Sequence, residues 1–218
     1  MHASRKLVLI HGLFLNRHIM GRLARHFRRR GWQVLTLDYP TTRQTLADTA
    51  ADWLPRIQAF AAGDSVDAVG HSLGGLLIRH LQAQWPQGFH RVVTLGTPHN
   101  GSVTGAYFHG FAKGALIGQA WPHGLDGHAP AWHADIPLLS IAGTKNTGVG
   151  SLFGLFRDQA GDGTVTVAET RLAEAAAYCD LPYSHTGMLF AREIADVATA
   201  WLGERAHPQI FTDFHKIS

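Results

Sequence analysis

The chain has 218 residues, of which 45% are apolar and 16% are charged, and these proportions fit one globular domain. Eleven Phe, six Trp and four Tyr argue against a disordered chain, which would be poor in such side chains. The net charge is +3 with histidine neutral. A single cysteine, Cys179, excludes an intrachain disulfide and favours a reducing compartment.

Membrane and export signals are not apparent. No apolar run reaches the ~20 residues that a membrane helix needs. The apolar run Leu7–Ile10 comes too soon and is too short for a secretory signal. We therefore expect a cytoplasmic protein with one domain over residues 1–203 and a C-terminal tail over 204–218, whose role the sequence leaves open.

Short apolar runs alternate with longer amphipathic stretches, which is typical of βαβ units. Strands are predicted at Leu7–Ile10, Gln33–Leu37, Val66–Val69, Arg91–Leu95, Pro137–Ala142 and Ala177–Leu181. Helices are predicted at 18–30, 43–61, 73–84, 170–176 and 187–202. The pattern predicts an α/β fold with a doubly wound, mostly parallel sheet of about six strands and helices on both faces.

The loop His11-Gly12-Leu13-Phe14 follows the first predicted strand. In a doubly wound sheet the strand order reverses between strands one and three, so the loops after these two strands flank one crevice. Acyl transfer requires two backbone N–H groups aimed at the developing oxyanion, one of them just after the nucleophile. Leu13, and Leu73 directly after the candidate nucleophile Ser72, are the candidate oxyanion donors.

The first predicted helix carries the densest positive charge. Eight of the 19 Lys and Arg lie in residues 1–31, most densely at Arg22, Arg25 and Arg28–Arg30. This run could attract anionic lipid, nucleic acid or an acidic substrate. Because Ile19, Leu23 and Phe27 form an apolar stripe opposite it, we favour a solvated helix face.

The segment Gly70-His71-Ser72-Leu73-Gly74 follows the third predicted strand and opens a predicted helix. A sharp strand-to-helix turn presents a serine hydroxyl alone, and it requires glycine two places before and after the serine. Chance matches to this pattern are frequent in a glycine-rich chain, so the flanking strand and helix carry the prediction. Ser72 is the candidate nucleophile.

Residues 99–136 and 143–161 are glycine-rich and lack clear periodicity. Both follow strands that end at one edge of the predicted sheet, so we expect lid or substrate-binding loops. Their apolar side chains, Leu152–Phe156, Trp121 and Trp132, could form an acyl pocket or an interfacial surface, or could equally cover exposed sheet. The sequence leaves these alternatives open.

The catalytic partners of a serine in this arrangement follow in the order carboxylate, then histidine. His185 lies between the last predicted strand and the last predicted helix, and is the candidate base. Asp162, which is flanked by glycines that let its loop turn inward, is the candidate acid. The rival carboxylates are Asp126, Asp135 and Asp158.

Histidines outside this set are interpreted as structural. Five of them fall in one irregular stretch, at His99, His109, His123, His128 and His133. Their spacing matches neither a helical pair nor a zinc-finger pattern, so we expect surface or lid positions and no metal site. His71 and His80 are predicted to be packing residues, and Cys179 a buried small hydrophobe.

The chain resembles the short bacterial lipase and esterase branch of the α/β-hydrolase superfamily. The matching stretches are Leu9–Leu13, Val69–Gly75, Gly96–Ser102, Asp162–Val165 and Ser184–Thr186. The chain departs from that family at Leu15, where relatives often have glycine, and in having no recognisable helical cap. It also starts at the family's third strand, which implies a minimal sheet.

The resemblance implies a serine hydrolase that cleaves a carboxylic ester through an acyl-enzyme and needs no cofactor. A thioesterase, an amidase or an acyltransferase would use the same triad. A non-catalytic binding module on the same fold is a more remote alternative. We expect a small-molecule or lipid-like ester as partner and no nucleic acid, because no reading element is recognised; peripheral membrane contact and oligomeric state stay open.

Overall fold

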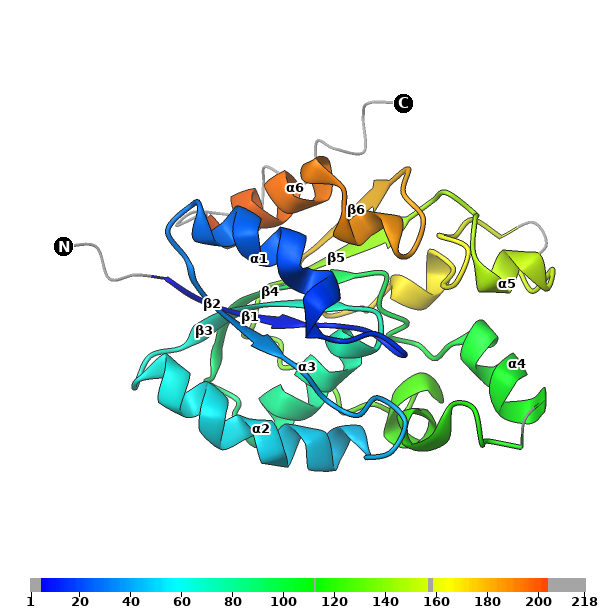
Figure 1. Ribbon diagram of the computed structural model, residues 1–218, viewed down its shortest axis with the longest axis horizontal. Helices are drawn as coiled ribbons and strands as arrows, with labels where there is room; N and C mark the ends of the chain where they lie inside the picture. The colour runs from blue at the N-terminus through cyan, green and yellow to red at the C-terminus, as the bar shows by residue number, and fades with distance from the viewer. Residues whose placement is uncertain (1–4, 112, 157–158, 204–218) are drawn as a thin grey trace.

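Six parallel strands form the centre of the molecule (Figure 1). The computed structural model describes residues 5–111, 113–156 and 159–203. The strands are β1 (Lys6–Ile10), β2 (Gln33–Leu37), β3 (Val66–His71), β4 (Phe89–Leu95), β5 (Leu138–Gly143) and β6 (Ala177–Leu181). Their order is β2-β1-β3-β4-β5-β6, so the order reverses between β1 and β3 as predicted. The predicted doubly wound parallel sheet is confirmed.

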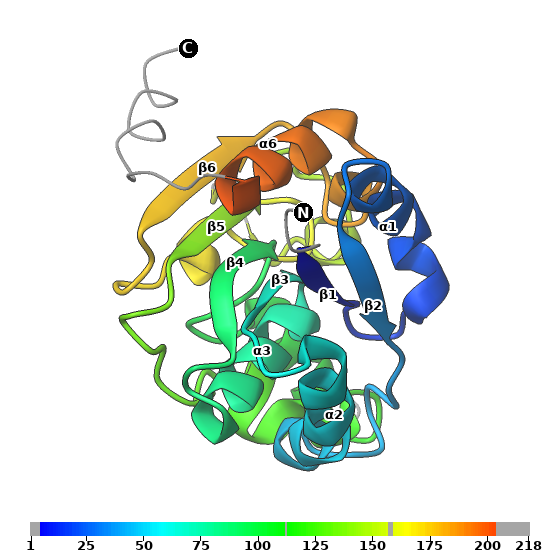
Figure 2. The same cartoon turned by 90° about the vertical axis from the view of Figure 1, so that its left-hand side faces the viewer.

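Helices cover both faces of the sheet (Figure 2). One face carries α1 (Gly21–Arg28) and α6 (Arg192–Gly203), and the other carries α2 (Leu46–Ala61) and α3 (Leu73–Gln84). The alternation of side chains along a strand divides the core accordingly. In β1, Leu7 and Leu9 join the apolar cluster with α1 and α6, whereas Val8 and Ile10 join the cluster with α2 and α3.

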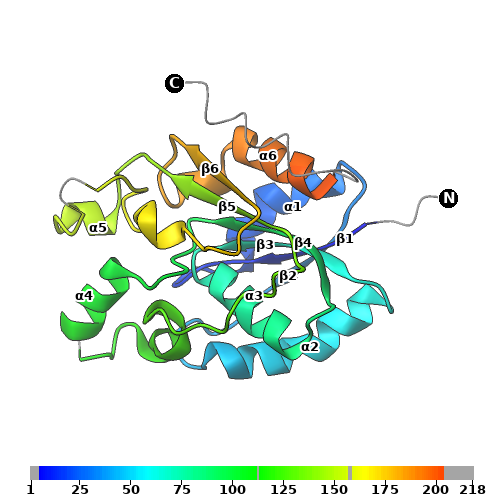
Figure 3. The same cartoon turned by 180° about the vertical axis from the view of Figure 1, so that it is seen from behind.

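Two further helices lie beyond the carboxyl ends of the strands, at the right of Figure 1. They are α4 (Val103–Phe111) and α5 (Val149–Leu152), and both fall in stretches predicted to be irregular. Short helical turns complete the chain: η1 (Arg17–Met20), η2 (Gly118–Ala120), η3 (Trp121–Leu125), η4 (Ala168–Thr170) and η5 (Gly187–Leu189). The two long stretches are therefore partly helical, and their helices α4 and α5 lie at the predicted edge (Figure 3).

The prediction of a helix at 170–176 is wrong. Only η4, which ends at Thr170, is helical there, and the chain then turns toward β6. The Ala176 N–H donates to the carbonyl oxygen of Leu138 at 3.0 Å, and the hydroxyl of Ser140 donates to the Thr170 carbonyl at 2.8 Å. Attachment to β5 thus overrides the helix propensity of this alanine-rich run.

The predicted faces of α1 and α6 hold with one exception. Leu23 and Phe27 of α1 are buried while the arginines opposite them are exposed. Ile194 and Trp201 of α6 are buried as predicted, but Phe190 precedes the helix and is 43% exposed. Within the described residues, none of the helices is long and apolar enough to cross a bilayer. The expected tail at 204–218 lies outside the described residues.

Candidate active site

Ser72 occupies a strained turn between β3 and α3. Its backbone has φ +53° and ψ −122°, a region that residues other than glycine rarely adopt. The Ser72 N–H donates to the carbonyl oxygen of Leu95 at 2.9 Å, which continues the pairing of β3 with β4 past the strand end. The Ser72 carbonyl accepts hydrogen bonds from the Thr97 hydroxyl at 2.9 Å and the Gly75 N–H at 3.0 Å. These bonds hold the turn in place.

Glycine on either side of Ser72 is required by close backbone contact. A Cβ atom on Gly70 would lie 2.6 Å from the Gly75 nitrogen, and one on Gly74 would lie 2.4 Å from the carbonyl oxygen of Ile10. Neither space admits a side chain, so the turn has the close strand–helix approach that the sequence predicts. The second contact also presses the start of α3 against the end of β1.

Asp162 and His185 form a buried pair at the same edge of the sheet. His185 Nδ1 donates to Asp162 Oδ2 at 2.6 Å, and the His185 backbone N–H donates to the Asp162 carbonyl at 2.9 Å. The other carboxylate oxygen, Oδ1, accepts from the N–H groups of Thr164 and Val165 at 2.9 and 2.7 Å. Backbone donors on Oδ1 thus fix the carboxylate, and its Oδ2 is directed at the imidazole of His185.

The side chain of His71 connects the Ser72 turn to His185. Its Nε2 donates to the His185 carbonyl oxygen at 3.0 Å, and the two imidazole rings are 4.6 Å apart. Burial and then the neighbouring His185 lower the pKa of His71 well below its usual value, so this imidazole is neutral. The sequence predicted only packing for His71; its position next to Ser72 was the signal for more.

Gly96 is a second residue whose importance the sequence did not reveal. It follows β4 with φ +56°, and a Cβ atom there would lie 2.7 Å from Asp162 Oδ2 and 3.0 Å from His185 Nδ1. The carboxylate and the imidazole therefore meet directly over a glycine. A glycine immediately after a strand that ends at the site edge was the available signal.

The loop after β1 lies beside the Ser72 turn. A Cβ atom on Gly12 would approach the Ser72 Cβ within 2.9 Å. Among the described residues, neither the Leu13 N–H nor the Leu73 N–H donates a hydrogen bond to a protein acceptor. Relatives often have glycine at the position of Leu15, but here the residue with a positive φ, of +58°, is Phe14. Two backbone donors near Ser72 are thus available to a ligand.

Buried Glu169 anchors α4 to the loop that carries Asp162. Its two carboxylate oxygens accept from the N–H groups of Val103, at the start of α4, and Thr166, each at 2.5 Å. Burial raises the pKa of Glu169, and nearby Asp162 raises it further, while the two N–H donors lower it. The first turn of α4 is thereby fixed by a residue 66 positions away.

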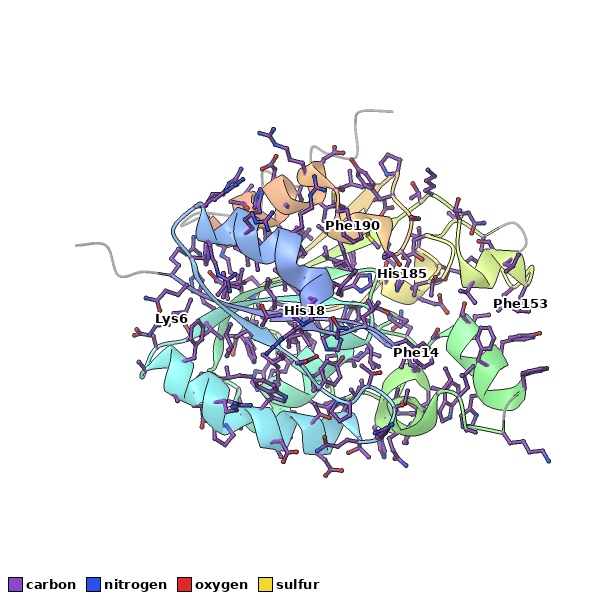
Figure 4. All side chains as sticks on the ribbon, in the orientation of Figure 1. Lys6, Phe14, His18, Phe153, His185 and Phe190 are labelled. Carbon is purple, nitrogen blue, oxygen red and sulfur yellow. The ribbon has the colours of Figure 1, made fainter. Side chains whose placement is uncertain are left out.

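The apolar side chains whose role the sequence did not decide lie partly in the core and partly on the surface. Trp132 and Phe156 are buried, whereas Leu152 and Phe153 of the α5 segment are exposed. Phe153 contacts Tyr107 and Phe108 of α4, with ring centroids 5.5 and 5.4 Å apart. Figure 4 shows Phe153 and Phe14 on the side of the molecule where the strands end. This exposed apolar surface lies at the same end of the molecule as the candidate site.

Two rival carboxylates have other roles. Asp126 accepts from the N–H groups of His123, Gly124 and His128 and so closes its own turn, while Asp135 is exposed. Asp158 lies outside the described residues.

The five histidines of the irregular stretch have different surroundings, and His99 is buried although a surface or lid position was expected. His109 stacks on Trp121 with centroids 4.3 Å apart, and His99 is buried against Trp132. Within the described ranges, no three side chains of His, Cys, Asp or Glu come together as metal ligands would. His80 donates to the His123 carbonyl at 2.7 Å, which accounts for its place on the apolar face of α3. Cys179 is buried, as predicted.

Comparison with known proteins gives the context of this arrangement. A family model described as the alpha/beta hydrolase fold matches residues 6–125. A curated triacylglycerol lipase from Pseudarthrobacter phenanthrenivorans is 30% identical over 118 residues, which are 54% of this chain and 33% of the lipase. The match thus spans about a third of that relative's length.

Solved structures of lipases share the fold. The mature lipase BlEst2 of Bacillus licheniformis superposes with a TM-score of 0.73 at 18% identity, covering 93% of both chains. A monoacylglycerol lipase of Paleococcus ferrophilus superposes with a TM-score of 0.59 at 17% identity, covering 89% of this chain and 94% of the other. Because the family model spans more than half of the sequence, the chain belongs to the alpha/beta hydrolase fold family.

Proposed function

We propose that this protein hydrolyses carboxylic esters, with Ser72 as nucleophile, His185 as base and Asp162 as the carboxylate that orients it. The observation that carries the proposal is the buried 2.6 Å hydrogen bond from His185 Nδ1 to Asp162 Oδ2, at the sheet edge where Ser72 occupies its strained turn. A strained serine next to a histidine–carboxylate pair has no evident structural benefit, and it is the arrangement that acyl transfer needs.

The reaction follows from the placement of these groups. His185 Nε2 takes the proton from Ser72 Oγ as that oxygen attacks the ester carbonyl carbon, and Asp162 keeps the Nδ1–H tautomer and stabilises the imidazolium. The N–H groups of Leu13 and Leu73 donate to the oxyanion, each contributing about 3–4 kcal/mol to transition-state stabilisation. His185 then protonates the departing alkoxide, which leaves an acyl-enzyme.

A water molecule completes the cycle. His185 removes a proton from the water, the resulting hydroxide adds to the acyl carbon, and the tetrahedral intermediate expels Ser72 Oγ, which regains the proton. The products are one alcohol and one carboxylic acid, and no cofactor enters the balance.

An uncharged or lipid-like substrate is part of the proposal. Support comes from the apolar surface on α4 and α5 beside the site, where Phe111 and Leu152 are 79% and 80% exposed. The names of the relatives, triacylglycerol lipase and monoacylglycerol lipase, agree with it.

We also propose a cytoplasmic location, which rests on the single cysteine and its burial.

A series of p-nitrophenyl esters, from acetyl to palmitoyl, tests this function. Ser72→Ala should lower kcat by about 10⁴-fold or more, because loss of a triad member removes the nucleophilic route. Ser102→Ala is the matched control, since Ser102 is also 8% exposed but its hydroxyl only caps the Gly105 N–H. Equal activity in wild type and Ser72→Ala would overturn the proposal. The acyl chain length that the wild type hydrolyses with the highest kcat/KM would define the acyl class of the substrate.

A further inference from the structure

A cavity lies between α1 and the start of α6, on the sheet face that these two helices cover. It has a volume of about 740 Å³ and is lined by five arginines, which define what we call the arginine groove: Arg22, Arg25, Arg29, Arg30 and Arg192. Leu23, Leu189 and Ala195 supply apolar lining, and the half-exposed ring of Phe190 stands beside them. In Figure 4 Phe190 lies on the α6 side, apart from Phe14 and Phe153.

The charge of this groove is not balanced by the acidic side chains that the structure describes. Asp196 bonds Arg30 at 2.8 Å and Arg192 at 3.4 Å, and its carboxylate also lies 3.6 Å from His26. Glu193, the next carboxylate on α6, is engaged by the Tyr183 hydroxyl at 2.9 Å.

The remaining three arginines, Arg22, Arg25 and Arg29, form no ion pair with an acidic residue of the described ranges. Five arginines therefore face a single carboxylate in one cavity, in a chain whose whole net charge is only +3.

Such an arrangement carries an electrostatic cost that a bound anion would relieve. Arginines three and four positions apart on α1, such as Arg22, Arg25 and Arg29, are neighbours on the helix surface and repel one another. The neighbouring charge is also visible at His26, whose pKa is lowered by burial and then by Arg30, with Asp196 acting in the opposite direction. A solvated helix face explains exposed arginines, but not their convergence with Arg192 on one cavity.

The donors in the groove specify the chemistry of the ligand. Guanidinium groups present paired N–H donors that match phosphate oxygens two at a time. The apolar lining and the exposed Phe190 ring add a contact for a carbon-containing part of the same molecule. We propose that the arginine groove binds an anionic organic phosphate through Arg22, Arg25 and Arg29, with Phe190 contacting the organic part.

The phosphate ester could belong to a lipid headgroup or to a soluble metabolite. Two binding assays distinguish these two ligands. The first measures sedimentation with phosphatidylcholine vesicles in which one lipid in five is phosphatidic acid. The second measures the heat of binding of inositol hexakisphosphate. Binding to vesicles alone would assign a lipid headgroup, and binding of the soluble phosphate as well would assign a site open to free phosphate esters. Both results support the groove.

Matched charge variants make the test specific. Arg22→Gln, Arg25→Gln and Arg29→Gln together should weaken binding about tenfold or more, because both probes lose their guanidinium donors. Arg17→Gln, Arg43→Gln and Arg56→Gln remove the same charge from exposed positions outside the groove and should leave affinity within about twofold. Thermal melts establish that both triple variants are folded.

The proposal does not rest on ester hydrolysis, so Ser72→Ala should bind both probes as the wild type does. It would be overturned if the wild type bound neither probe, or if the two triple variants lost affinity equally. The latter result would assign binding to the overall charge of the protein.

Discussion

The imidazole of His71 donates from Nε2 to the main-chain carbonyl oxygen of His185, across 3.0 Å. The two residues are 114 positions apart, and the bond joins the turn that carries Ser72 to the loop that carries the proposed base. This bond requires a proton on Nε2, and because the strongly lowered pKa keeps the ring neutral, His71 is the Nε2–H tautomer. We therefore expect His71 to position His185.

Removing this donor should impair catalysis more than binding. We expect His71→Leu to lower kcat for a p-nitrophenyl ester by about 10–100-fold with little change in KM, because a small displacement of the base is costly. His71→Gln, whose side-chain amide can donate from a similar position, should recover much of the loss. Equal kcat in all three proteins, measured by steady-state kinetics, would show that the bond has no positioning role.

Gly96 should tolerate no side chain. Gly96→Ala places a Cβ within 2.7 Å of Asp162 Oδ2, so the Asp162–His185 hydrogen bond must shift, and we expect kcat to fall by about 100-fold. The matched control is Gly154→Ala, where φ is +63° and nothing lies within 4 Å of the new Cβ. Both variants should lose about 1 kcal/mol of stability from backbone strain, but only the first should lose activity. Retained activity in Gly96→Ala would contradict the geometry.

Acid should destabilise the fold through His99. Burial and then Arg79 lower the pKa of His99 to about 3, from an ordinary value of 6.5. Between these two pH values the unfolded state binds the proton and the folded state does not, so the free energy of unfolding falls as the pH falls through this window. The slope from one such proton is about 1.4 kcal/mol per pH unit.

The variant His99→Gln should therefore flatten the decline of Tm between pH 6.5 and acid, even if its Tm at neutral pH is lower. His18→Gln, which changes an exposed histidine, should leave the decline as it is in the wild type. Parallel Tm curves for wild type and His99→Gln, measured by calorimetry, would exclude His99 as a source of acid lability.

The exposed apolar surface on α4 and α5 should favour long acyl chains. Changing Phe111 and Leu152 to serine should lower kcat/KM for palmitoyl esters by about 5–30-fold, since the two side chains together contribute about 1–2 kcal/mol when they leave water on contact with substrate. Hydrolysis of the acetyl ester serves as the internal control and should change little. A uniform loss across the ester series would mean that the substitutions damage the site and not the substrate contact.

Local pattern was sufficient for much of the fold. The strands at Gln33–Leu37 and Ala177–Leu181 begin and end where the apolar runs predicted, because β-branched and apolar side chains fit a sheet covered on both faces. The glycines around Ser72 predicted a close strand–helix turn, and the contacts of Gly70 and Gly74 agree. The pairing of Asp162 with His185 followed from the chain order of the elements and from the edge where parallel strands end.

Features fixed by distant contacts could not be predicted in the same way. Helix α4 contains Gly105 and Gly110, which lower its helix propensity, and its first turn is held by the Glu169 carboxylate. Residues 171–176 do not form the predicted helix because hydrogen bonds attach this segment to β5. Phe190 does not lie on the apolar face of α6 because that helix begins only at Arg192. Likewise, nothing in the spacing of arginines on α1 indicated that Arg192 would face them.

Labelling with a fluorophosphonate tests the central claim most directly, since this reagent phosphonylates a serine only where a base and an oxyanion site activate it. Intact-protein and peptide mass spectrometry should find one adduct, on Ser72. The adduct should be absent in Ser72→Ala and form at least about 100-fold more slowly in His185→Ala, in which the proposed base is missing. An adduct on another serine, or labelling of Ser72→Ala at the wild-type rate, would contradict the account.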